Sequence, residues 1–257
     1  MSDLAASGKL EIGRVIKEIF DVIGRNLPTF LILAVLLTGV PTAIVYALQG
    51  DPGQVTSPTL FGARIWGAVG GGLVAAIFAL ILQCAIIYAT VSDLNGRRPS
   101  VADSLSVGLR VFLPVLLIGI LFVLAYLCGV VLLIVPGIMI AVAWCVAVPA
   151  YVIERPPLTQ SFARSAALTR GNRWRIFGLF CLYILAFFVI ALIVGLIASL
   201  TKIFTVGGLP FLTRVILSPL INVGSGLLGA VGAAVLYVEL RRLKDGVGPE
   251  GLAAIFD

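Results

Sequence analysis

Histidine is absent from the 257-residue chain, and this absence removes the commonest general base and metal ligand of enzymes. The sequence also lacks a phosphate-binding loop of the Walker type, the Gly-x-Ser-x-Gly motif of serine hydrolases, and any cluster of cysteines or carboxylates at metal-ligand spacing. We therefore expect a protein that is not an enzyme and holds neither a metal nor a cofactor.

Charged residues are scarce as well. They make up 12% of the chain, against about 25% in ordinary soluble domains, while 60% of the residues are apolar and the mean hydropathy is +1.15. So few charges could not keep the surface of a soluble protein hydrated, and disordered chains are poor in apolar residues rather than rich in them. The composition predicts a membrane protein that crosses the bilayer several times.

Six stretches have the length and apolarity of a membrane-spanning helix, which needs about 20 residues to cross a hydrocarbon core of about 30 Å. These runs lack the period-two alternation of barrel strands, so we expect an all-α, polytopic fold and a single membrane domain over residues 1–257. The four cysteines all fall in these stretches, where buried cysteine acts as a small apolar side chain. The predicted spans are Leu27–Leu48, Ile65–Val91, Val111–Val135, Ile138–Ile153, Ile176–Leu200 and Leu212–Val238.

Basic residues are distributed unevenly between the loops. If the N-terminus lies in the cytoplasm, 15 of the 18 Lys and Arg residues fall in cytoplasmic segments, and this bias is the main determinant of membrane topology. We expect a multi-pass protein of the bacterial cytoplasmic (inner) membrane with both termini in the cytoplasm. The net charge of +6 follows from this topology and from attraction to anionic lipid, so it implies no nucleic-acid partner.

A pattern of apolar residues four apart, followed by Leu-Pro, precedes two of the spans. It runs from Val15 to Pro28 and again from Val101 to Pro114, and a similar pattern from Leu158 is separated from the fifth span by residues 168–174. We interpret the chain as three repeats, each an interfacial amphipathic helix followed by a transmembrane hairpin. Alternatively, the amphipathic helices pack beneath the protein's own bundle. The repeat units are about residues 9–92, 97–154 and 157–244, followed by a cytoplasmic tail over 245–257.

Few polar side chains lie deep in the predicted spans, and no charged residue lies in the middle of one, which argues against a proton relay. Gln83, Asn222 and Ser225, with Gly229 one turn further on, are expected to mediate helix packing through hydrogen bonds and close approach. Alternatively, they line a polar path between helices. Glycines in residues 67–72 predict a second small-residue face, which packs within the monomer or, as the alternative, against another copy.

The segment over residues 154–175 is rich in arginine and begins a new helix after Pro156 and Pro157. Arginine matches the geometry of phosphate and Trp suits the membrane interface, so the segment predicts a site for anionic phospholipid headgroups. The alternative is an anchor that only sets topology, with Arg164 paired to Glu154. The predicted headgroup residues are Arg155, Ser161, Arg164, Ser165, Arg170, Arg173, Trp174 and Arg175.

Four short motifs follow one another in the second half of the chain: Val135-Pro-Gly, Pro149-Ala-Tyr-Val-Ile-Glu, Ser161-x3-Ser-x2-Leu-Thr-x-Gly-x2-Trp, and Tyr237-Val-Glu-Leu-Arg-Arg. Together they resemble the bacterial integral-membrane family known as the membrane domain of glycerophosphoryl diester phosphodiesterases. The resemblance covers roughly residues 129–244, although the family often has Asp where this chain has Glu239. It implies a six-span domain without catalytic activity, because hydrolysis in that family belongs to a separate barrel of about 250 residues. No segment outside the spans is long enough for such a barrel.

These features favour a non-enzymatic membrane protein that binds anionic phospholipids through a basic cytoplasmic collar and organises the membrane or a partner. A permease or lipid-translocating subunit is the alternative. An assembly factor or a subunit of a larger complex is a third hypothesis. Besides anionic phospholipids, the partners considered are a second copy of the chain, in a homo-oligomer, or another membrane protein. The amino-acid pattern does not select a lipid species or a substrate.

Overall fold

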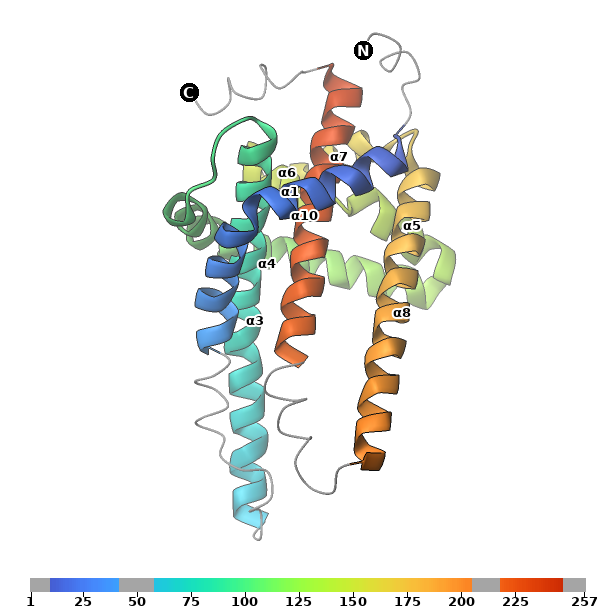
Figure 1. The fold of residues 1–257 in the computed structure, drawn as a ribbon. Helices are drawn as coiled ribbons and strands as arrows, with labels where there is room; N and C mark the ends of the chain where they lie inside the picture. The colour runs from blue at the N-terminus through green and yellow to red at the C-terminus, as the bar shows by residue number, and fades with distance from the viewer. Residues whose placement is uncertain (1–9, 42–57, 205–217, 247–257) are drawn as a thin grey trace.

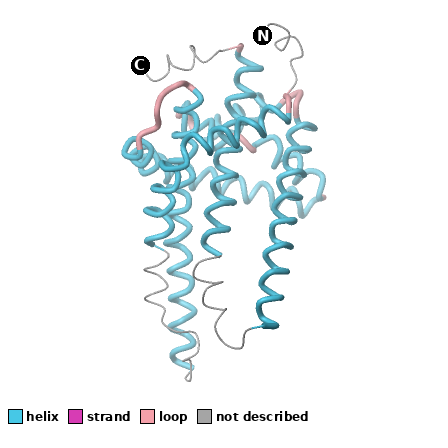
Figure 2. Tube along the Cα trace, in the orientation of Figure 1, coloured by secondary structure: helices cyan, strands magenta, loops and turns pink. Residues whose placement is uncertain are grey.

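The computed structural model describes residues 10–41, 58–204 and 218–246, which form helices joined by short turns (Figures 1 and 2). Within these ranges there is no strand, so the predicted all-α fold is confirmed. The helices are α1 (Ile12–Ala34), η1 (Val35–Gly39), α3 (Pro58–Leu94), α4 (Val101–Leu132), α5 (Ile134–Trp144), α6 (Ala147–Glu154), α7 (Leu158–Thr169), α8 (Arg173–Phe204) and α10 (Ser218–Asp245).

The predicted number of spans is also confirmed. Six helical stretches among the described residues are long and apolar enough to cross a membrane, and they overlap the six predicted spans. The fourth differs from the prediction of one continuous helix, because it is divided into α5 and α6 at Cys145 and Val146. Pro149, inside α6, has no backbone N–H to donate to the carbonyl of Cys145, so the helical hydrogen-bond pattern lacks one bond at this point.

The long helices do not all run in one direction. In Figure 1, α3, α8 and α10 run along the length of the molecule, whereas the end of α4 and the adjoining α5 run across it, behind them. The tip of this α4–α5 hairpin is strongly apolar and exposed, since residues 131–135 are each 65–85% accessible. The hairpin holds together at Gly129 and Gly137, because a Cβ on Gly129 would lie only 3.0 Å from the Cα of Gly137.

The buried core lies in one half of the molecule, where α1, the ends of α3 and α10, the start of α4, and α6 meet. In the most apolar stretch of α3 and in that of α10, half of the residues are buried within the protein. In the corresponding stretch of α8, only 6% of the residues are buried. Between residues 181 and 196, every α8 side chain that the structure describes is therefore exposed. Such a surface is stable only against lipid or another apolar partner.

The first half of α1 crosses α10, and its second half runs beside α3 (Figure 1). Its apolar face packs on the protein itself: Val15 and Val22 are at most 1% exposed, and Ile19 approaches Gly232 of α10. In α7, Phe162 and Leu168 are buried in the same way. In α1 and α7 apolar residues therefore pack against the protein itself, whereas Leu109 and Leu113 of the second pattern are exposed.

Candidate functional site: the charged end

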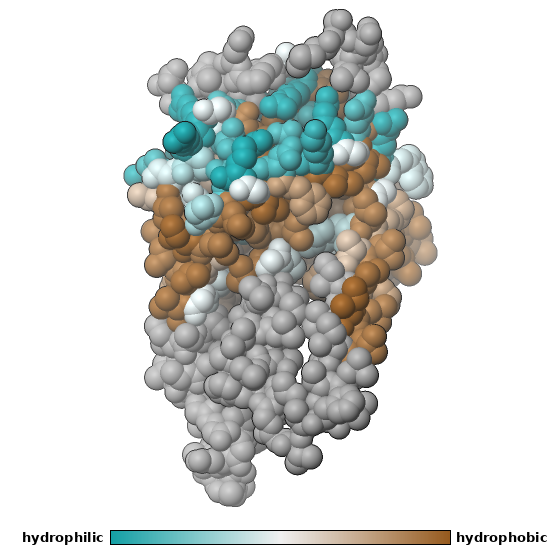
Figure 3. Space-filling view, in the orientation of Figure 1, coloured by the Kyte–Doolittle hydropathy of each residue, from teal (hydrophilic) through white to brown (hydrophobic). Residues whose placement is uncertain are grey.

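Most charged side chains of the described residues gather at one end of the molecule, where the first half of α1, the helix α7 and the last turns of α10 lie. We call this region the charged end. In Figure 3 it forms a hydrophilic band above an apolar surface. Ion pairs connect its elements: Arg25 of α1 lies 2.8 Å from Asp93 of α3, and Arg14 of α1 pairs with the buried Glu239 of α10.

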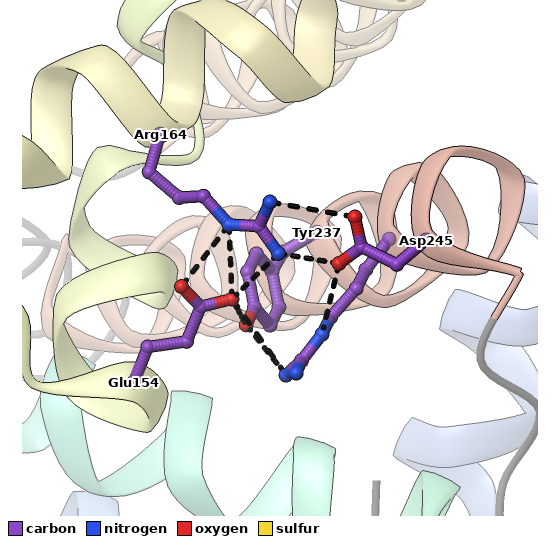
Figure 4. Close-up of polar contacts among 5 residues, drawn as sticks. Glu154, Arg164, Tyr237 and Asp245 are labelled. Carbon is purple, nitrogen blue, oxygen red and sulfur yellow. Dashed lines mark hydrogen bonds and ion pairs between the residues drawn. The ribbon is translucent and has the colours of Figure 1, made fainter. Parts of the chain in front are cut away.

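Five side chains from α6, α7 and α10 form a connected polar network (Figure 4). Arg164 donates from Nε to Glu154 Oε2 at 3.1 Å and from Nη2 to Asp245. The hydroxyl of Tyr237 donates to Glu154 Oε1 at 2.7 Å and accepts from Arg241 at 3.1 Å. Arg241 Nε lies 3.5 Å from Asp245, and this ion pair closes the ring of contacts.

The charges of this network balance, because two carboxylates face two guanidinium groups. Hydrogen bonds from Arg164 to Asp245 and to Glu154, together with their negative charges, raise the pKa of this guanidinium above its ordinary value. Arg164 is therefore occupied within the protein, as the topology-anchor alternative predicts from its pairing with Glu154. This position does not support Arg164 as a headgroup ligand.

The two serines predicted to bind headgroups are buried in α7, within the protein. Ser165 Oγ donates to the carbonyl of Ala143 at 2.9 Å and accepts from the backbone N–H of Val146 at 3.3 Å. It thereby satisfies backbone groups left open where α5 ends and α6 begins, and Thr169 adds a second hydroxyl to Ala143. Ser161 Oγ is buried without a hydrogen-bond partner. Neither serine is available to a headgroup in this structure.

The turn between α7 and α8 is fixed by Asn172. Its side-chain oxygen accepts from the backbone N–H of Leu10 at 3.0 Å, and its backbone oxygen accepts from Ile176. Arg175 donates to the carbonyl of Leu10, so this predicted headgroup residue binds the chain just before α1. Of the intervening residues 168–174, only 170–172 form a turn, because α7 extends to Thr169 and α8 begins at Arg173, and this turn is anchored on the chain just before α1.

Three of the predicted headgroup arginines remain without a partner among the described residues: Arg155, Arg170 and Arg173. Lys244 is also unpaired there, and its Nζ would lie 3.9 Å from a Cβ on Gly171 in the α7–α8 turn. Two arginines occupy the first turn of α8, which contains no acidic residue. A positive charge at a helix N-terminus is unfavourable, so an anion at this turn would be stabilised.

Arg173 and Trp174 also line an apolar cavity of about 350 Å³ between α5 and α8. Its other walls are Val135, Ile138, Met139, Val142 and Phe177. The Nε of Arg173 is buried without a hydrogen-bond partner, whereas Trp174 is 85% exposed. The cavity therefore combines apolar walls with an unpaired guanidinium at its rim.

Of the residues predicted for helix packing or a polar path, the structure describes Gln83, Ser225 and Gly229. Gln83 lies half-buried in α3, and the side chain of Asn222 falls outside the described part. Ser225 accepts a hydrogen bond through its backbone oxygen from Tyr183 at 3.2 Å. Gly229 lines a second cavity of about 270 Å³ between α1, α8 and α10, whose other walls are almost all apolar. The described part of this group therefore shows contacts between helices, and the polar path stays an alternative prediction.

The small-residue face predicted at residues 67–72 makes no close helix contact at Gly70 or Gly72 within the described part of the monomer. A Cβ added to Gly67, Gly70 or Gly72 would meet no described atom within 4 Å on its outward side. The close approach occurs instead at Gly108, where a Cβ would lie 2.8 Å from the carbonyl oxygen of Ile81. The described helices therefore meet at a glycine that the sequence pattern did not single out.

Sequence reasoning missed Asp245 and Arg241 as members of the network. Their spacing of four residues near the end of α10 was a usable signal, because residues four apart share one face of a helix. Their partners on α6 and α7 lie about 80 residues away in the sequence. Only the fold shows that these segments meet.

No metal-binding group of three or more His, Cys, Asp or Glu side chains occurs among the residues that the structure describes. Comparisons with protein-family models, curated proteins and solved structures give no match for this chain. The family resemblance drawn from short motifs therefore stays a prediction, and the site must be judged from its own geometry.

Proposed function

We propose that this multi-pass membrane protein has no enzymatic activity and binds anionic phospholipid headgroups at its charged end, and so organises the surrounding membrane or a partner protein. In this proposal the protein lies in the bacterial cytoplasmic membrane, with the charged end and both termini on the cytoplasmic side. The positive-inside distribution of Lys and Arg supports that orientation.

One observation carries the proposal: the charged end separates its cations into a paired and an unpaired set. Arg14, Arg25, Arg164 and Arg241 have carboxylate partners within the fold. In the described structure Arg155, Arg170, Arg173 and Lys244 have none. Each unpaired basic residue near an anionic surface gains about 1 kcal/mol, so the unpaired set favours contact with negatively charged lipid.

A lipid-dependent stability measurement tests the proposal. The purified full chain in a neutral detergent would receive dioleoylphosphatidylglycerol or dioleoylphosphatidylcholine at equal concentration, and its thermal unfolding would be followed. We expect the anionic lipid to raise the unfolding temperature more, because a ligand bound only by the folded state stabilises it. Equal effects of the two lipids would overturn the proposal.

A matched pair of variants separates a local site from net charge. In the triple variant Arg155→Gln/Arg170→Gln/Arg173→Gln, the preference for the anionic lipid should largely disappear. The control Lys17→Gln/Arg98→Gln/Arg110→Gln removes the same charge from other unpaired cations and should keep most of it. If both triple variants lose the preference equally, the interaction is a general effect of charge, and the unpaired set is not a site.

A further inference from the structure

We infer that the cavity between α5 and α8 is the binding site of one anionic phospholipid. Its phosphate binds Arg173, and its acyl chain enters the cavity beside Trp174. This inference rests on the proposed function and deepens it, because it assigns one lipid molecule to one place. It differs from a diffuse attraction between a basic surface and a negatively charged bilayer.

The chemistry of the cavity selects an amphipathic anion. Five of its seven lining residues are apolar side chains from α5 and α8, and Arg173 contributes the positive charge. The Arg173 Nε is a buried donor without a partner, and such a donor costs free energy unless a ligand satisfies it. Phosphate oxygens are strong acceptors for guanidinium, and an acyl chain matches the apolar walls.

The position of the cavity favours a membrane lipid over a soluble ligand. Ile138 and Met139 of the wall are exposed on the apolar surface of the molecule, and every described side chain of α8 between residues 181 and 196 is exposed. Trp174 lies at the rim, where aromatic residues mark the boundary between headgroups and chains. An acyl chain that enters the cavity here would already lie in the hydrocarbon phase of the bilayer.

Two further cations belong to the α7–α8 turn that precedes Arg173. Arg170 directly follows the last residue of α7, and Lys244 approaches the same turn from α10. Neither has a carboxylate partner among the described residues. The site would therefore favour an anionic phospholipid over a zwitterionic one, whose choline would add positive charge. The volume of about 350 Å³ lies within the roughly 300–1,000 Å³ range of ligand pockets.

Native mass spectrometry with matched variants tests the site. The full chain would be released from detergent with added dioleoylphosphatidylglycerol, and the fraction that retains one lipid would be titrated. We expect Arg173→Gln to weaken retention of the first lipid about tenfold, because a charge-assisted hydrogen bond is lost. Val135→Trp, which fills the cavity without a change in charge, should weaken it to a similar extent.

The control variants carry the same kinds of substitution at positions outside the cavity. Arg98→Gln removes an unpaired charge elsewhere, and Val131→Trp places the same bulk on the exposed hairpin tip. Both should retain the lipid as the natural chain does, and Arg173→Lys should restore part of the binding. Excess inorganic phosphate should not displace the lipid, since it offers no chain. Thermal unfolding of every variant would verify that it folds.

The possible results separate this inference from the proposed function. Loss of the first lipid in both Arg173→Gln and Val135→Trp, with both controls unchanged, supports the site. If either variant keeps full affinity, or if free phosphate displaces the lipid, the site is wrong, although a general preference for anionic lipid would leave the proposed function standing. If the natural chain shows no preference for phosphatidylglycerol over phosphatidylcholine, the proposed function fails with it.

Discussion

At the residue scale, the hydroxyl of Ser165 explains how α5 and α6 can be separate helices inside an apolar core. It donates to Ala143 and accepts from Val146 on either side of the break. A buried backbone group without a partner is costly, so this one side chain stabilises an interruption to which the missing N–H of Pro149 contributes. Four residues earlier in the same helix, Ser161 has no such role, although the sequence pattern treats the two serines alike.

The contrast between the two serines gives a direct prediction. Ser165→Ala leaves the N–H of Val146 without an acceptor and should lower the free energy of unfolding by about 1–3 kcal/mol. Ser161→Ala removes a buried hydroxyl that has no partner and should leave stability unchanged or higher. Thermal unfolding in one detergent would compare them, and an equal loss in both variants would contradict the assigned role of Ser165.

Arg155 gives a second prediction at this scale. It is the one non-glycine residue with positive φ in the described chain, at φ 50° and ψ 43°, and it precedes Pro156. A side chain in this conformation costs about 1–3 kcal/mol of strain. Arg155→Gly should therefore give a higher unfolding temperature than Arg155→Ala, because both remove the charge but only glycine relieves the strain. The opposite order would show that the turn is not strained.

At the element scale, the crossing of α3 and α4 depends on one glycine. A Cβ at Gly108 would lie 2.8 Å from the carbonyl oxygen of Ile81, closer than two such atoms approach. Gly108→Ala should separate the helices and cost about 1–3 kcal/mol of stability. Gly119→Ala, in the same helix with no described atom within 4 Å, should instead gain up to about 1 kcal/mol. Thermal unfolding of the pair tests the crossing, and two neutral variants would refute it.

The elements themselves were largely predictable, because an apolar run of about 20 residues has few alternatives in a membrane protein. All six predicted spans correspond to helices, and Pro28 and Pro114 are passed without a break. The division of the fourth span was not predictable from hydropathy, since Cys145 and Val146 are as apolar as their neighbours. Pro149 was a signal for it, but a proline within an apolar run can also kink a helix rather than end it.

The candidate site was predicted only in part, because local sequence does not show which side chains form ion pairs in the fold. A run of arginines identifies the segment that meets the headgroups, yet pairing depends on segments that are distant in the sequence. Arg164 meets Asp245 of α10, while Arg170 and Arg173 meet no carboxylate among the described residues. The local sequence pattern could suggest Glu154 as a partner of Arg164. It could not show which arginines form ion pairs within the protein and which have no carboxylate partner.

At the scale of the whole molecule, the network around Arg164 connects the helix before α8 with the end of α10. A double-mutant cycle of Arg164→Gln and Asp245→Asn should give a coupling free energy of about 1–2 kcal/mol, since both side chains are less than one-third exposed. Arg170→Gln, an unpaired charge at the end of the same helix, should change stability by less than about 0.5 kcal/mol. Additive effects of the Arg164 and Asp245 substitutions would show that the pair contributes nothing.

The direction of the α4–α5 hairpin leads to a prediction about membrane topology. Two uninterrupted spans would place the turn at residues 135–137 in water on the side opposite the charged end. In the structure the hairpin runs across the length of α3, α8 and α10, at a level close to the hydrophilic band (Figures 1 and 3). If those three helices cross the bilayer, the exposed apolar tip at Leu133 lies among the acyl chains instead.

Single-cysteine labelling distinguishes the two arrangements. In a background with all four native cysteines replaced by alanine, a membrane-impermeant maleimide should label Asp51→Cys from outside intact cells and Gln160→Cys only after the cytoplasmic face is opened. Leu133→Cys should resist the reagent from both sides, because thiols in hydrocarbon remain protonated and are not reached by a charged probe. It should react once the membrane is dissolved in dodecyl sulfate, which shows that the thiol is present and reactive. Labelling of Leu133→Cys from outside, at a rate like that of Asp51→Cys, would instead mean that α4 and α5 cross the bilayer as a conventional pair.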